Sequence, residues 1–460
     1  MTQHKDQSVL VLGLGETGLS MVRWLSAQRA RLRVADSRSE PPDLDKIGQY
    51  VPAGQIYCGN FNDALFDGIE LIAISPGVPL RDPAVARAVA RGIEVVGDIE
   101  LFARSLPKDN RPHILAITGA NGKTTVTSMV EHLCKTAGKD AVAAGNISPA
   151  VLDVVLERGV NQPEVWVLEL SSFQLETTNS LNADAATVLN ISEDHLDRYT
   201  DMNEYVSAKA RVFSNCGVQI LNRDDESSMG MAREECKVIT FGLDAPNNAS
   251  DFGVESDSGE VWLVQGNSRL LKASEMQMVG MHNVANALAA LALSRAIDFP
   301  MSILLEALRS FKGLPHRVER VAEISGITYY DDSKGTNVGA TVAALQGLGC
   351  KAVLIAGGEG KGQDFAPLIP AVAAHARAVV LIGRDAPLIA VDLNGCGVDV
   401  LYAEEMNDAV QLATRLAQSG DAVLLSPACA SFDMYRNYEH RAEIFIEAVH
   451  RLTKEEFWSH

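Results

Sequence analysis

The sequence predicts an α/β protein with three domains, and two observations lead to this prediction. Apolar runs of strand length alternate with helix-like stretches, which is typical of parallel sheets covered by helices. The length of 460 residues also corresponds to about three domains of ordinary size. We place a Rossmann-like domain at residues 1–104, a central domain with a P-loop ATPase-type parallel sheet and a small β hairpin at 105–313, and a second Rossmann-like domain at 314–460.

The overall charge and the cysteine pattern exclude several classes of protein. A net charge of −19 argues against binding to the phosphate backbone of nucleic acids. Seven cysteines without a CxxC pair are typical of a reduced, cytosolic protein. The apolar run at 9–14 is too short for a signal peptide, and no run approaches the roughly 20 apolar residues that cross a membrane. We therefore expect a cytoplasmic monomer that binds neither nucleic acid nor membrane and that places cations locally for anionic ligands.

The first domain carries a glycine pattern that is typical of diphosphate binding. A predicted strand at 8–12 leads into Gly13-Leu14-Gly15-Glu16-Thr17-Gly18, and Asp36 ends the next strand. This is a G-x-G-x-x-G motif with an acid about 20 residues further on. A further strand at 71–74 ends in the turn Ser75-Pro76-Gly77 at the same sheet edge. Either a nicotinamide dinucleotide or UDP would satisfy this chemistry, and glycines that only allow close helix–strand packing are the structural alternative.

The central domain contains the most informative segment, Ile117-Thr118-Gly119-Ala120-Asn121-Gly122-Lys123-Thr124-Thr125. It joins a predicted strand at 113–118 to a predicted helix at 126–137. A glycine loop at a helix N-terminus presents backbone N–H groups to phosphates, Lys123 adds a cation, and the Thr124 hydroxyl is suited to Mg²⁺. The general P-loop pattern has a glycine five positions before the Gly-Lys pair, where Ile117 stands, so this is a compact form. The loop predicts ATP binding.

Two further strands should bring polar residues to the same edge. A strand at 165–168 delivers Glu169, and a strand at 186–191 leads to Ser192 and the acidic residues after it. Acids at strand ends beside a P-loop commonly bind Mg²⁺ or organise its water.

The rest of the central domain is predicted as loop, hairpin and helix. Residues 244–258 are rich in Asp, Asn and Ser and read as a loop, and 261–271 reads as a hairpin that turns at 266–268. A helix begins at His282-Asn283 and continues to about 296. Near its start, Asn286 has a structural alternative, because asparagine is an ordinary helix-start residue.

The third domain contains four strand-like runs, each followed by a polar or glycine-rich loop. The runs lie at 327–330, 352–356, 379–382 and 422–425. Because the strands alternate with helices, we expect them to be parallel and their following loops to share one sheet edge. Ligands bind at that edge in open α/β sheets.

These motifs resemble the Mur ligase family across nearly the whole chain. The compact ATP loop, Glu169-Leu170-Ser171-Ser172-Phe173-Gln174-Leu175, the stretch 194–198 and His282-Asn283 are similar to the Mur and folylpolyglutamate ligase superfamily. The stretches 13–20, 332–337 and 426–438 resemble the D-glutamate-adding branch. The Asp-Asn-Pro-Arg motif of the diaminopimelate-adding branch has no counterpart; its nearest string is Arg384-Asp385-Ala386-Pro387. Ala442, where the family usually has glycine, is a small departure.

The resemblance implies an ATP-dependent amide ligase of peptidoglycan precursor synthesis. Its substrates would be ATP, UDP-N-acetylmuramoyl-L-alanine and D-glutamate, and its cofactor two Mg²⁺ ions. Transfer of the γ-phosphoryl group to a carboxylate gives an acyl phosphate, which the incoming amine attacks through a tetrahedral intermediate. Such chemistry needs positioned cations because two anionic groups must approach each other.

The resemblance also carries residue roles onto this sequence. It implies catalytic roles for Lys123, Glu169, His195, Lys209, Arg317 and Lys361. It implies ATP contacts at Gly119, Asn121, Gly122, Lys123, Thr124, Thr125, Asn283, Arg317 and Asp331. It implies contacts to the UDP substrate at Glu16, Thr17, Asp36, Ser37, Arg38, Ser75, Gly77, Asn146, Ser171 and Gln174. It implies D-glutamate contacts at Lys334, Thr336, Lys361, Ser431, Phe432 and Tyr438. It implies metal ligands at Thr124 and Glu169 for one ion and at His195 and Lys209, as a carbamate, for the other.

Two of these residues have plain structural alternatives. Lys209 stands in Ser-Ala-Lys-Ala-Arg, where a helix lysine is ordinarily solvated. Carbamylation requires a neutral amine, which burial near other cations would favour. Arg317 stands at the join of the second and third domains, and an interdomain salt bridge would explain it equally well.

Three other functions compete with the amide ligase. A nicotinamide oxidoreductase would use the first domain but would leave the ATP loop, Glu169 and the third domain without a role. A non-catalytic ATP-switched binding protein would leave the polar loops of three domains unexplained. A folylpolyglutamate synthase would not need the diphosphate motif of the first domain. For a ligase, we expect the third domain to close over the central one, because an acyl phosphate must be shielded from water.

Overall fold

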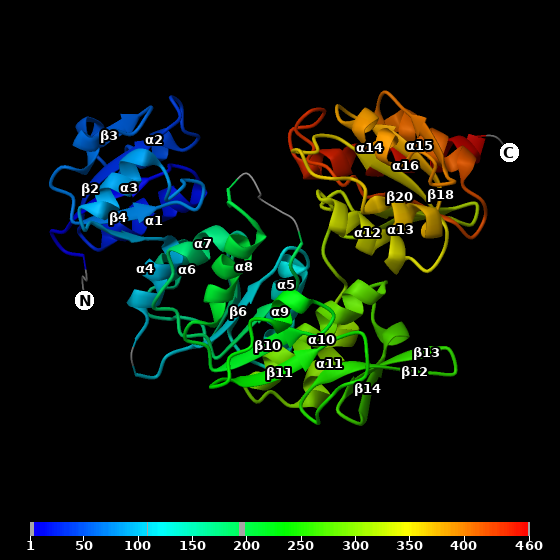
Figure 1. Cartoon of the computed structure of the whole chain (residues 1–460), viewed down its shortest axis with the longest axis horizontal. Coiled ribbons are helices and arrows are strands. Elements are labelled where there is room, and N and C mark those ends of the chain that lie inside the picture. The colour runs from blue at the N-terminus through cyan, green and yellow to red at the C-terminus, as the bar shows by residue number, and fades with distance from the viewer. Residues whose placement is uncertain (1–3, 108, 193–197, 459–460) are drawn as a thin grey trace.

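The computed structural model describes residues 4–107, 109–192 and 198–458 of the chain. In this described part the strands form four sheets, three of them mainly or wholly parallel. Figure 1 shows a body at each end of the chain, with the longer middle segment between and below them. The predicted α/β class is confirmed.

The first sheet has the strand order β3-β2-β1-β4-β5, and its pairs are parallel. Its strands are β1 (Ser8–Leu12), β2 (Arg31–Asp36), β3 (Ile56–Cys58), β4 (Leu71–Ile74) and β5 (Glu94–Val96). Its helices are α1 (Glu16–Ala27), α2 (Leu44–Ile47) and α3 (Pro83–Ala90). The strand order reverses at β1, so the loops after β1, β2 and β4 meet at one edge, where such sheets bind ligands. The strands predicted at 8–12 and 71–74 are confirmed.

Helix α4 (Asp98–Ser105) follows β5 and packs toward the central domain. Its Phe102 ring lies 4.7 Å, centroid to centroid, from the ring of Trp166. Both side chains are buried in one apolar cluster that joins the first and central sheets. The helix therefore belongs to the contact between the two bodies, and Figure 1 shows it there beside α6.

The central sheet has the order β11-β10-β9-β6-β8-β7 and its pairs are parallel. Its strands are β6 (His113–Thr118), β7 (Ala141–Gly145), β8 (Val165–Glu169), β9 (Ala185–Val188), β10 (Val218–Asn222) and β11 (Lys237–Phe241). Its helices are α5 (Lys123–Thr136), α6 (Val151–Arg158), α7 (Ser172–Glu176), α8 (Met202–Ala210), α9 (Glu226–Met229), α10 (Met281–Ala296) and α11 (Met301–Ser310). Strand β6 lies between β8 and β9, so the ATP loop is flanked by the residues that follow those strands.

Two boundaries differ from the sequence prediction. Helix α5 begins at Lys123 rather than at 126, because Gly122 with a φ of 84° starts the helix directly after the loop. Strand β9 ends at Val188 rather than at 191. The reason is that the Asn190 carbonyl turns away to accept a hydrogen bond from the Ala120 N–H at 2.9 Å.

A small antiparallel sheet projects from the central domain. It consists of β12 (Phe252–Asp257), β13 (Glu260–Gln265) and β14 (Ser268–Lys272). The predicted hairpin is confirmed, but the predicted loop is wrong over β12. Its first residues, Phe252 and Val254, are buried, while the polar residues that follow them are exposed. Polar composition around this short apolar pair concealed the strand.

The third sheet has the order β15-β16-β20-β17-β18-β19. Its strands are β15 (Glu319–Ile324), β16 (Ile327–Asp331), β17 (Ala352–Gly357), β18 (Ala376–Ile382), β19 (Asp399–Tyr402) and β20 (Ala422–Leu425). Its helices are α12 (Val338–Gly347), α13 (Leu368–His375), α14 (Ala386–Asp392), α15 (Met406–Leu416) and α16 (Tyr438–Trp458). The four predicted strands are parallel and their following loops share one edge, as expected. The edge strands β15, which is antiparallel, and β19 were not predicted.

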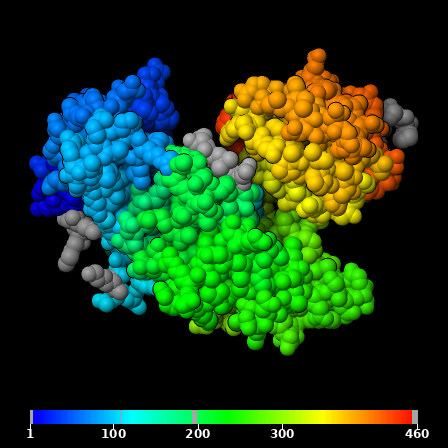
Figure 2. All heavy atoms as spheres, in the orientation of Figure 1, coloured from blue at the N-terminus to red at the C-terminus, as the bar shows by residue number. Residues whose placement is uncertain are grey.

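The first and third domains stand on the same side of the central domain. Figure 2 shows a hollow between them, above the central domain. In the described residues no helix is both long and apolar enough to span a bilayer.

Candidate active site

The ATP loop is held in a conformation that only glycine permits at two positions. Gly119 has a φ of 152° and Gly122 a φ of 84°. A Cβ atom on Gly122 would lie 2.6 Å from Asn286 Oδ1, so this residue must be glycine for packing as well. The Lys123 ammonium donates to the carbonyls of Gly119 and Ala120, both at 2.8 Å. The cation therefore lies directly over the loop, at the N-terminus of α5.

Asn190 fixes the loop from the end of β9. Its Oδ1 accepts from the Asn121 N–H at 2.8 Å, and its Nδ2 donates to the Asn121 carbonyl at 3.1 Å. Sequence reasoning missed Asn190 because it lies inside the strand predicted at 186–191, whereas β9 ends at Val188.

Glu169 lies at the end of β8 with only 2% of its surface exposed. Its Oε1 accepts from Asn146 Nδ2 at 2.8 Å. Its Oε2 is buried and has no hydrogen-bond partner in the described structure. A buried carboxylate oxygen without a donor is costly unless a cation is present. The residues therefore fit a Mg²⁺ ion at this edge, close to Thr124 in the first turn of α5.

Lys209 is buried, so the solvated alternative is wrong. The residue is 2% exposed, and its Nζ donates to the Gly119 carbonyl at 2.9 Å. The same atom lies 4.7 Å from the centroid of the Tyr205 ring. Lys209 thus reaches the ATP loop from the far end of α8. His195 lies outside the described residues.

The loops of the first domain are tied together by one carboxylate. The Asp36 Oδ2 accepts from the Leu14 N–H at 2.7 Å and from Arg38 at 2.7 Å, and Oδ1 accepts from Arg38 Nε at 2.8 Å. Burial acts to raise the pKa of Asp36, but these hydrogen bonds outweigh it and lower the pKa to about 2. Asp36 therefore fixes the position of Arg38, whose side chain is 54% exposed. Ser75 Oγ donates to the Gly13 carbonyl at 3.0 Å, which joins the loop after β4 to the loop after β1.

The glycines of this motif have different roles. A Cβ on Gly18 would lie 1.9 Å from the Gly13 carbonyl oxygen, so Gly18 serves helix–strand packing. A Cβ on Gly15 would meet nothing within 4 Å. Gly15 therefore leaves open space at the N-terminus of α1, where a diphosphate would lie. The packing alternative explains Gly18 but not Gly15.

Contacts between the first and central domains involve the loops that carry the candidate substrate residues. Ser148 Oγ donates to Glu16 Oε1 at 2.7 Å. Arg198 donates to the carbonyls of Pro76 at 3.0 Å and Val78 at 3.1 Å, on either side of Gly77. These contacts align the candidate UDP-binding loops with the edge that carries the ATP loop. Arg198 had no role in the sequence prediction.

Ser171 and Gln174 form a capping box at the start of α7. Ser171 Oγ accepts from the Gln174 N–H, and Gln174 Oε1 accepts from the Ser171 N–H at 3.1 Å. The Gln174 amide also donates to Asp98 Oδ2 at 3.0 Å. Asp98 was not predicted as a site residue.

The third domain contacts the ATP loop directly. Asn337 Nδ2 donates to Asn121 Oδ1 at 3.0 Å. Burial lowers the pKa of Arg317, opposed by attraction to Asp332 and Glu169. Burial also lowers the pKa of Lys334, and repulsion from Arg317 adds to this. Arg317 and Lys334 are therefore candidates for the local positive charge that an acidic protein needs in order to bind a triphosphate. Arg317 forms no ion pair with a described residue, so the salt-bridge alternative is not supported.

Two candidate ATP contacts already have protein partners. Asp331 is fully buried; its Oδ2 lies 2.7 Å from His316 Nδ1 and its Oδ1 accepts from the Ser333 N–H at 2.9 Å. Burial raises the pKa of Asp331 while His316 opposes the rise. Asn283 Nδ2 donates to the Val279 carbonyl at 2.8 Å.

The candidate D-glutamate residues lie on neighbouring loops of the third sheet. Glu359 and Ala430 exchange two backbone hydrogen bonds at 2.9 Å, which join the loop of Lys361 to that of Ser431. Lys361 is exposed with a φ of 54°, and Phe432 is 66% exposed. Elsewhere on this edge, Lys334 Nζ lies 3.7 Å from the centroid of the Tyr438 ring. Thr336 lies in the same loop as Lys334. In the first domain, Ser37 directly follows Asp36.

Arg441 joins two of these loops from α16. The residue is 1% exposed and donates to Ser333 Oγ at 3.0 Å, to the Ser333 carbonyl at 2.8 Å and to the Cys429 carbonyl at 3.1 Å. Burial lowers its pKa to about 10. Arg441 was not predicted as a site residue, and its spacing from the loops gave no signal for this contact.

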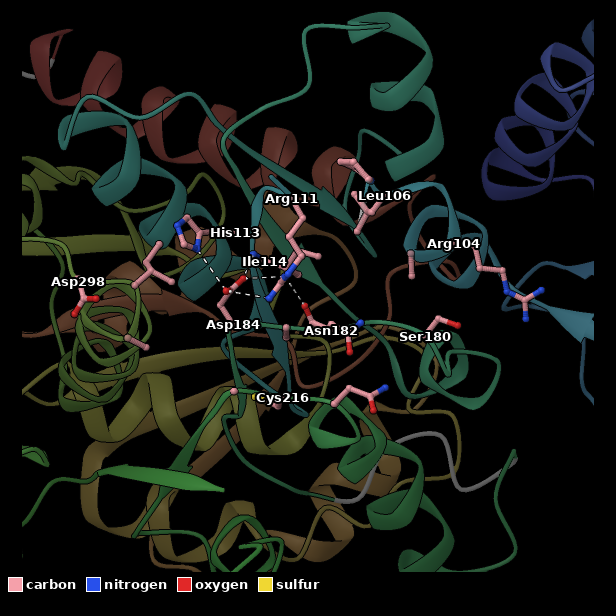
Figure 3. A pocket seen from close by; sticks show the side chains of 17 residues that line it. Arg104, Leu106, Arg111, His113, Ile114, Ser180, Asn182, Asp184, Cys216 and Asp298 are labelled. Carbon is pink, nitrogen blue, oxygen red and sulfur yellow. Dashed lines mark hydrogen bonds and ion pairs between the residues drawn. The ribbon is translucent and has the colours of Figure 1, made fainter. Parts of the chain in front are cut away.

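A cavity lies elsewhere, at the amino ends of β6, β9 and β10. It measures about 990 Å³, and Figure 3 shows Arg111 and His113 turned toward Asp184 in its wall. Arg111 donates to both oxygens of Asp184 at 3.2 Å, so these charges already satisfy each other. Because parallel sheets bind ligands at their carboxyl edge, we place the active site at the opposite edge despite the size of this cavity.

Three sheets with a loop suited to phosphate on the middle one are the arrangement expected of an ATP-dependent ligase whose substrates are held on different domains. Three family models match the chain: Mur ligase MurD-like, N-terminal domain at residues 7–97, Mur ligase middle domain at 117–294, and Mur ligase, glutamate ligase domain at 316–429. The chain belongs to the Mur ligase family.

Individual relatives support the same assignment. The chain is 58% identical to a UDP-N-acetylmuramoylalanine–D-glutamate ligase of Methylobacillus flagellatus, over 99% of both chains. It is 55% identical to the protein of that name from Nitrosomonas europaea, over 99% of this chain and 98% of the relative. Its fold is similar to a UDP-N-acetylmuramate–alanine ligase of Thermotoga maritima, with a TM-score of 0.60 and 21% identity over 96% of this chain and 99% of the other.

Proposed function

We propose that this protein joins D-glutamate to UDP-N-acetylmuramoyl-L-alanine at the expense of ATP. The observation that carries the proposal is the 58% identity, over 99% of both chains, to a relative named for that reaction. The geometry supports it because the candidate loops of the first domain contact the central domain through Ser148 and Arg198, and Asn337 of the third domain contacts the ATP loop. An amide ligase with three substrates needs such an arrangement.

The proposed reaction has two steps. A carboxylate oxygen of UDP-N-acetylmuramoyl-L-alanine attacks the γ-phosphorus of ATP, and the bond to the bridging oxygen breaks to release ADP. The amine of D-glutamate then attacks the acyl phosphate carbonyl, and the tetrahedral intermediate expels phosphate while the nitrogen loses a proton. The protein supplies positioning and charge stabilisation for both steps.

Local cations support the first step. Lys123 lies over the ATP loop and is suited to the β- and γ-phosphates. Arg317 and Lys334 are further candidates from the third domain, whose Asn337 contacts the ATP loop; the charge of Arg317 lowers the pKa of Lys334 and that of Glu169 opposes this. Together they would neutralise the charge that otherwise keeps a carboxylate from a triphosphate.

Residues at the central edge are suited to hold Mg²⁺. Thr124 and the unpartnered oxygen of Glu169 would bind one ion, and His195 with a carbamate on Lys209 would bind the second. Bound Mg²⁺ would stabilise negative charge on the transferring phosphoryl group. Carbamylation of Lys209 gains support from its burial, which favours the neutral amine that reacts with CO₂. The carbamate nitrogen would keep one N–H for the Gly119 carbonyl.

The remaining roles follow the layout of the loops. The loops after β1, β2 and β4 would hold UDP, while Asn146, Ser171 and Gln174 would contact the rest of that substrate. The loops after β16, β17 and β20 would bind D-glutamate, and Asn283 and Asp331 the adenosine. We propose domain boundaries near 104 and 313 and a monomeric protein. We also propose a cytoplasmic location, since the nucleotide substrates are cytoplasmic.

Phosphate release tests the proposal. We would measure it with ATP, Mg²⁺ and UDP-N-acetylmuramoyl-L-alanine while varying D-glutamate, L-glutamate and meso-diaminopimelate. Turnover with D-glutamate alone is the expected result. Turnover with another amino acid would keep the ligase chemistry but change the acceptor, and no turnover would refute the proposed reaction. A thermal-shift comparison of the UDP substrate with NAD separates the dehydrogenase alternative.

A further inference from the structure

Helix α4 presents two buried carboxylates to the segment that contains α7. Asp98 is 1% exposed and Glu100 is 0% exposed. Glu100 Oε2 accepts from the backbone N–H groups of Asn179 at 2.7 Å and Ser180 at 2.8 Å, just after α7. Asp98 Oδ2 accepts from the side chain of Gln174, within α7. One carboxylate therefore holds the backbone of this segment, and the other holds a side chain.

The Gln174 side chain is fixed at both ends of its amide. Its Nε2 donates to Asp98 at 3.0 Å and its Oε1 accepts from the Ser171 N–H at 3.1 Å. An ionised carboxylate only accepts hydrogen bonds, so Asp98 determines which end of the amide faces α4. A flipped amide would place two acceptors against each other at Asp98 and two donors against each other at Ser171.

The residue before α4 lies close to the residue after α7. A Cβ on Gly97, the residue before α4, would lie 2.4 Å from Thr177 Oγ1. Asp98 Oδ1 is buried and has no hydrogen-bond partner in the part of the chain that the structure describes. A carboxylate kept in such surroundings is expensive to maintain, and a merely structural contact would be served as well by a neutral amide.

We propose that Asp98 is a positioning residue that fixes the orientation of the Gln174 amide for the nucleotide-sugar substrate, whereas Glu100 only anchors the segment. The inference rests on the proposed function, because Gln174 must contact that substrate. Burial raises the pKa of Asp98 to about 6. At pH 8 the group is therefore ionised, and the amide has a single orientation.

A double-mutant cycle at pH 8 tests the proposal. We expect Asp98→Ala to raise the KM for UDP-N-acetylmuramoyl-L-alanine about tenfold, with kcat and the KM for ATP changed by less than about threefold. Asp98→Asn, which keeps the volume but permits both amide orientations, should raise the same KM by about threefold. Neither change should add to the effect of Gln174→Ala, because Asp98 acts only through that side chain.

Glu100→Gln is the matched control on the same helix. It should lower the Tm but leave the KM for the UDP substrate within about twofold. Additive effects of Asp98→Ala and Gln174→Ala, or a Gln174→Ala variant with unchanged KM, would overturn the proposal. Should Asp98→Ala fail to fold, the cycle with Asp98→Asn gives the same test.

Calorimetric binding of the UDP substrate without ATP separates this inference from the proposed function. Binding without ligation of D-glutamate would refute the proposed reaction, and the Kd values of the variants would then decide on Asp98. If wild-type protein does not bind the UDP substrate, both proposals fail.

Discussion

Lys209 is a buried lysine beside the ATP loop, and burial changes the chemistry of its amine. Lys209 is 2% exposed and reaches the Gly119 carbonyl. We expect Lys209→Ala to lose ligase activity because a carbamate at this position would hold metal. High bicarbonate should not restore the variant, whereas formate or acetate should partly rescue it by replacing the missing carboxylate.

The matched control is Lys135→Ala, since the Lys135 side chain is 56% exposed and pairs with Glu131. Phosphate release is the measurement for both variants. Full activity of untreated Lys209→Ala would refute the proposed carbamate.

Lys361 occupies an exposed position with a φ of 54° in the loop after β17. If it binds a carboxylate of D-glutamate, its loss removes a charge-assisted hydrogen bond of about 1.5–3 kcal/mol. Lys361→Ala should therefore weaken the use of D-glutamate roughly 10- to 100-fold. Lys351→Ala, at the other end of the same strand, is the control. An unchanged KM for D-glutamate and kcat would remove Lys361 from the pocket.

The Asp332 carboxyl group should make stability depend on pH. Burial raises its pKa from 3.8 to about 7, although Ser426 and Arg317 oppose the rise. Between about pH 4 and 7 the unfolded chain loses a proton that the folded protein keeps, so stability falls as the pH rises through this window.

Asp332→Asn removes this titration. The Tm of the variant relative to wild type should therefore increase between pH 4 and pH 8, measured by calorimetry. Asp364→Asn, at an exposed site in the same domain, should show no such trend. A constant difference for Asp332→Asn would contradict the assigned pKa.

At the scale of elements, the start of α1 contains one glycine that close packing requires, Gly18, and one that faces open space, Gly15. A Cβ on Gly18 would lie 1.9 Å from a backbone oxygen, which no rotamer change can relieve. Gly18→Ala should destabilise the first domain by more than about 3 kcal/mol, since overpacking alone costs about 1–3 kcal/mol. Gly15→Ala should leave the Tm nearly unchanged, because φ is −88° and the space is open. Equal Tm values for the two variants would contradict this distinction.

Elements with regular apolar runs could be predicted from the sequence, and those defined by pairing could not. The runs of β1, β4, β6 and β20 gave their bounds because these strands are buried on both faces. Strand β12 was not predicted because its pairing with β13 makes it a strand, whereas its polar composition indicated a loop.

The site divides in the same way. Residues at strand ends and helix starts, such as Glu169 and Lys123, follow from local sequence. Asp98 contacts Gln174 of α7 and Arg441 contacts Ser333, which lie 76 and 108 positions away in the chain, so only the fold reveals these contacts.

At the scale of the whole molecule, a hydrogen bond joins the third domain to the ATP loop. Asn337 Nδ2 donates to Asn121 Oδ1, while Asn337 Oδ1 caps α12 by accepting from the Ala340 N–H at 2.9 Å. Nucleotide at the loop can therefore act on the position of the third domain through a direct contact. The contact suits the shielding that an acyl phosphate requires.

Asn337→Asp tests this coupling without removing the helix cap. Aspartate caps a helix as well as asparagine does, but it cannot donate to Asn121, and its charge would oppose the triphosphate. We expect the radius of gyration of wild-type protein, measured by X-ray scattering, to decrease when ATP analogue and UDP substrate bind. The variant should contract less and show about a tenfold higher KM for ATP, while its Tm stays near that of wild type. Identical scattering curves of wild-type protein with and without ligands would refute closure, whereas full contraction of the variant would assign the closing force to contacts other than Asn337.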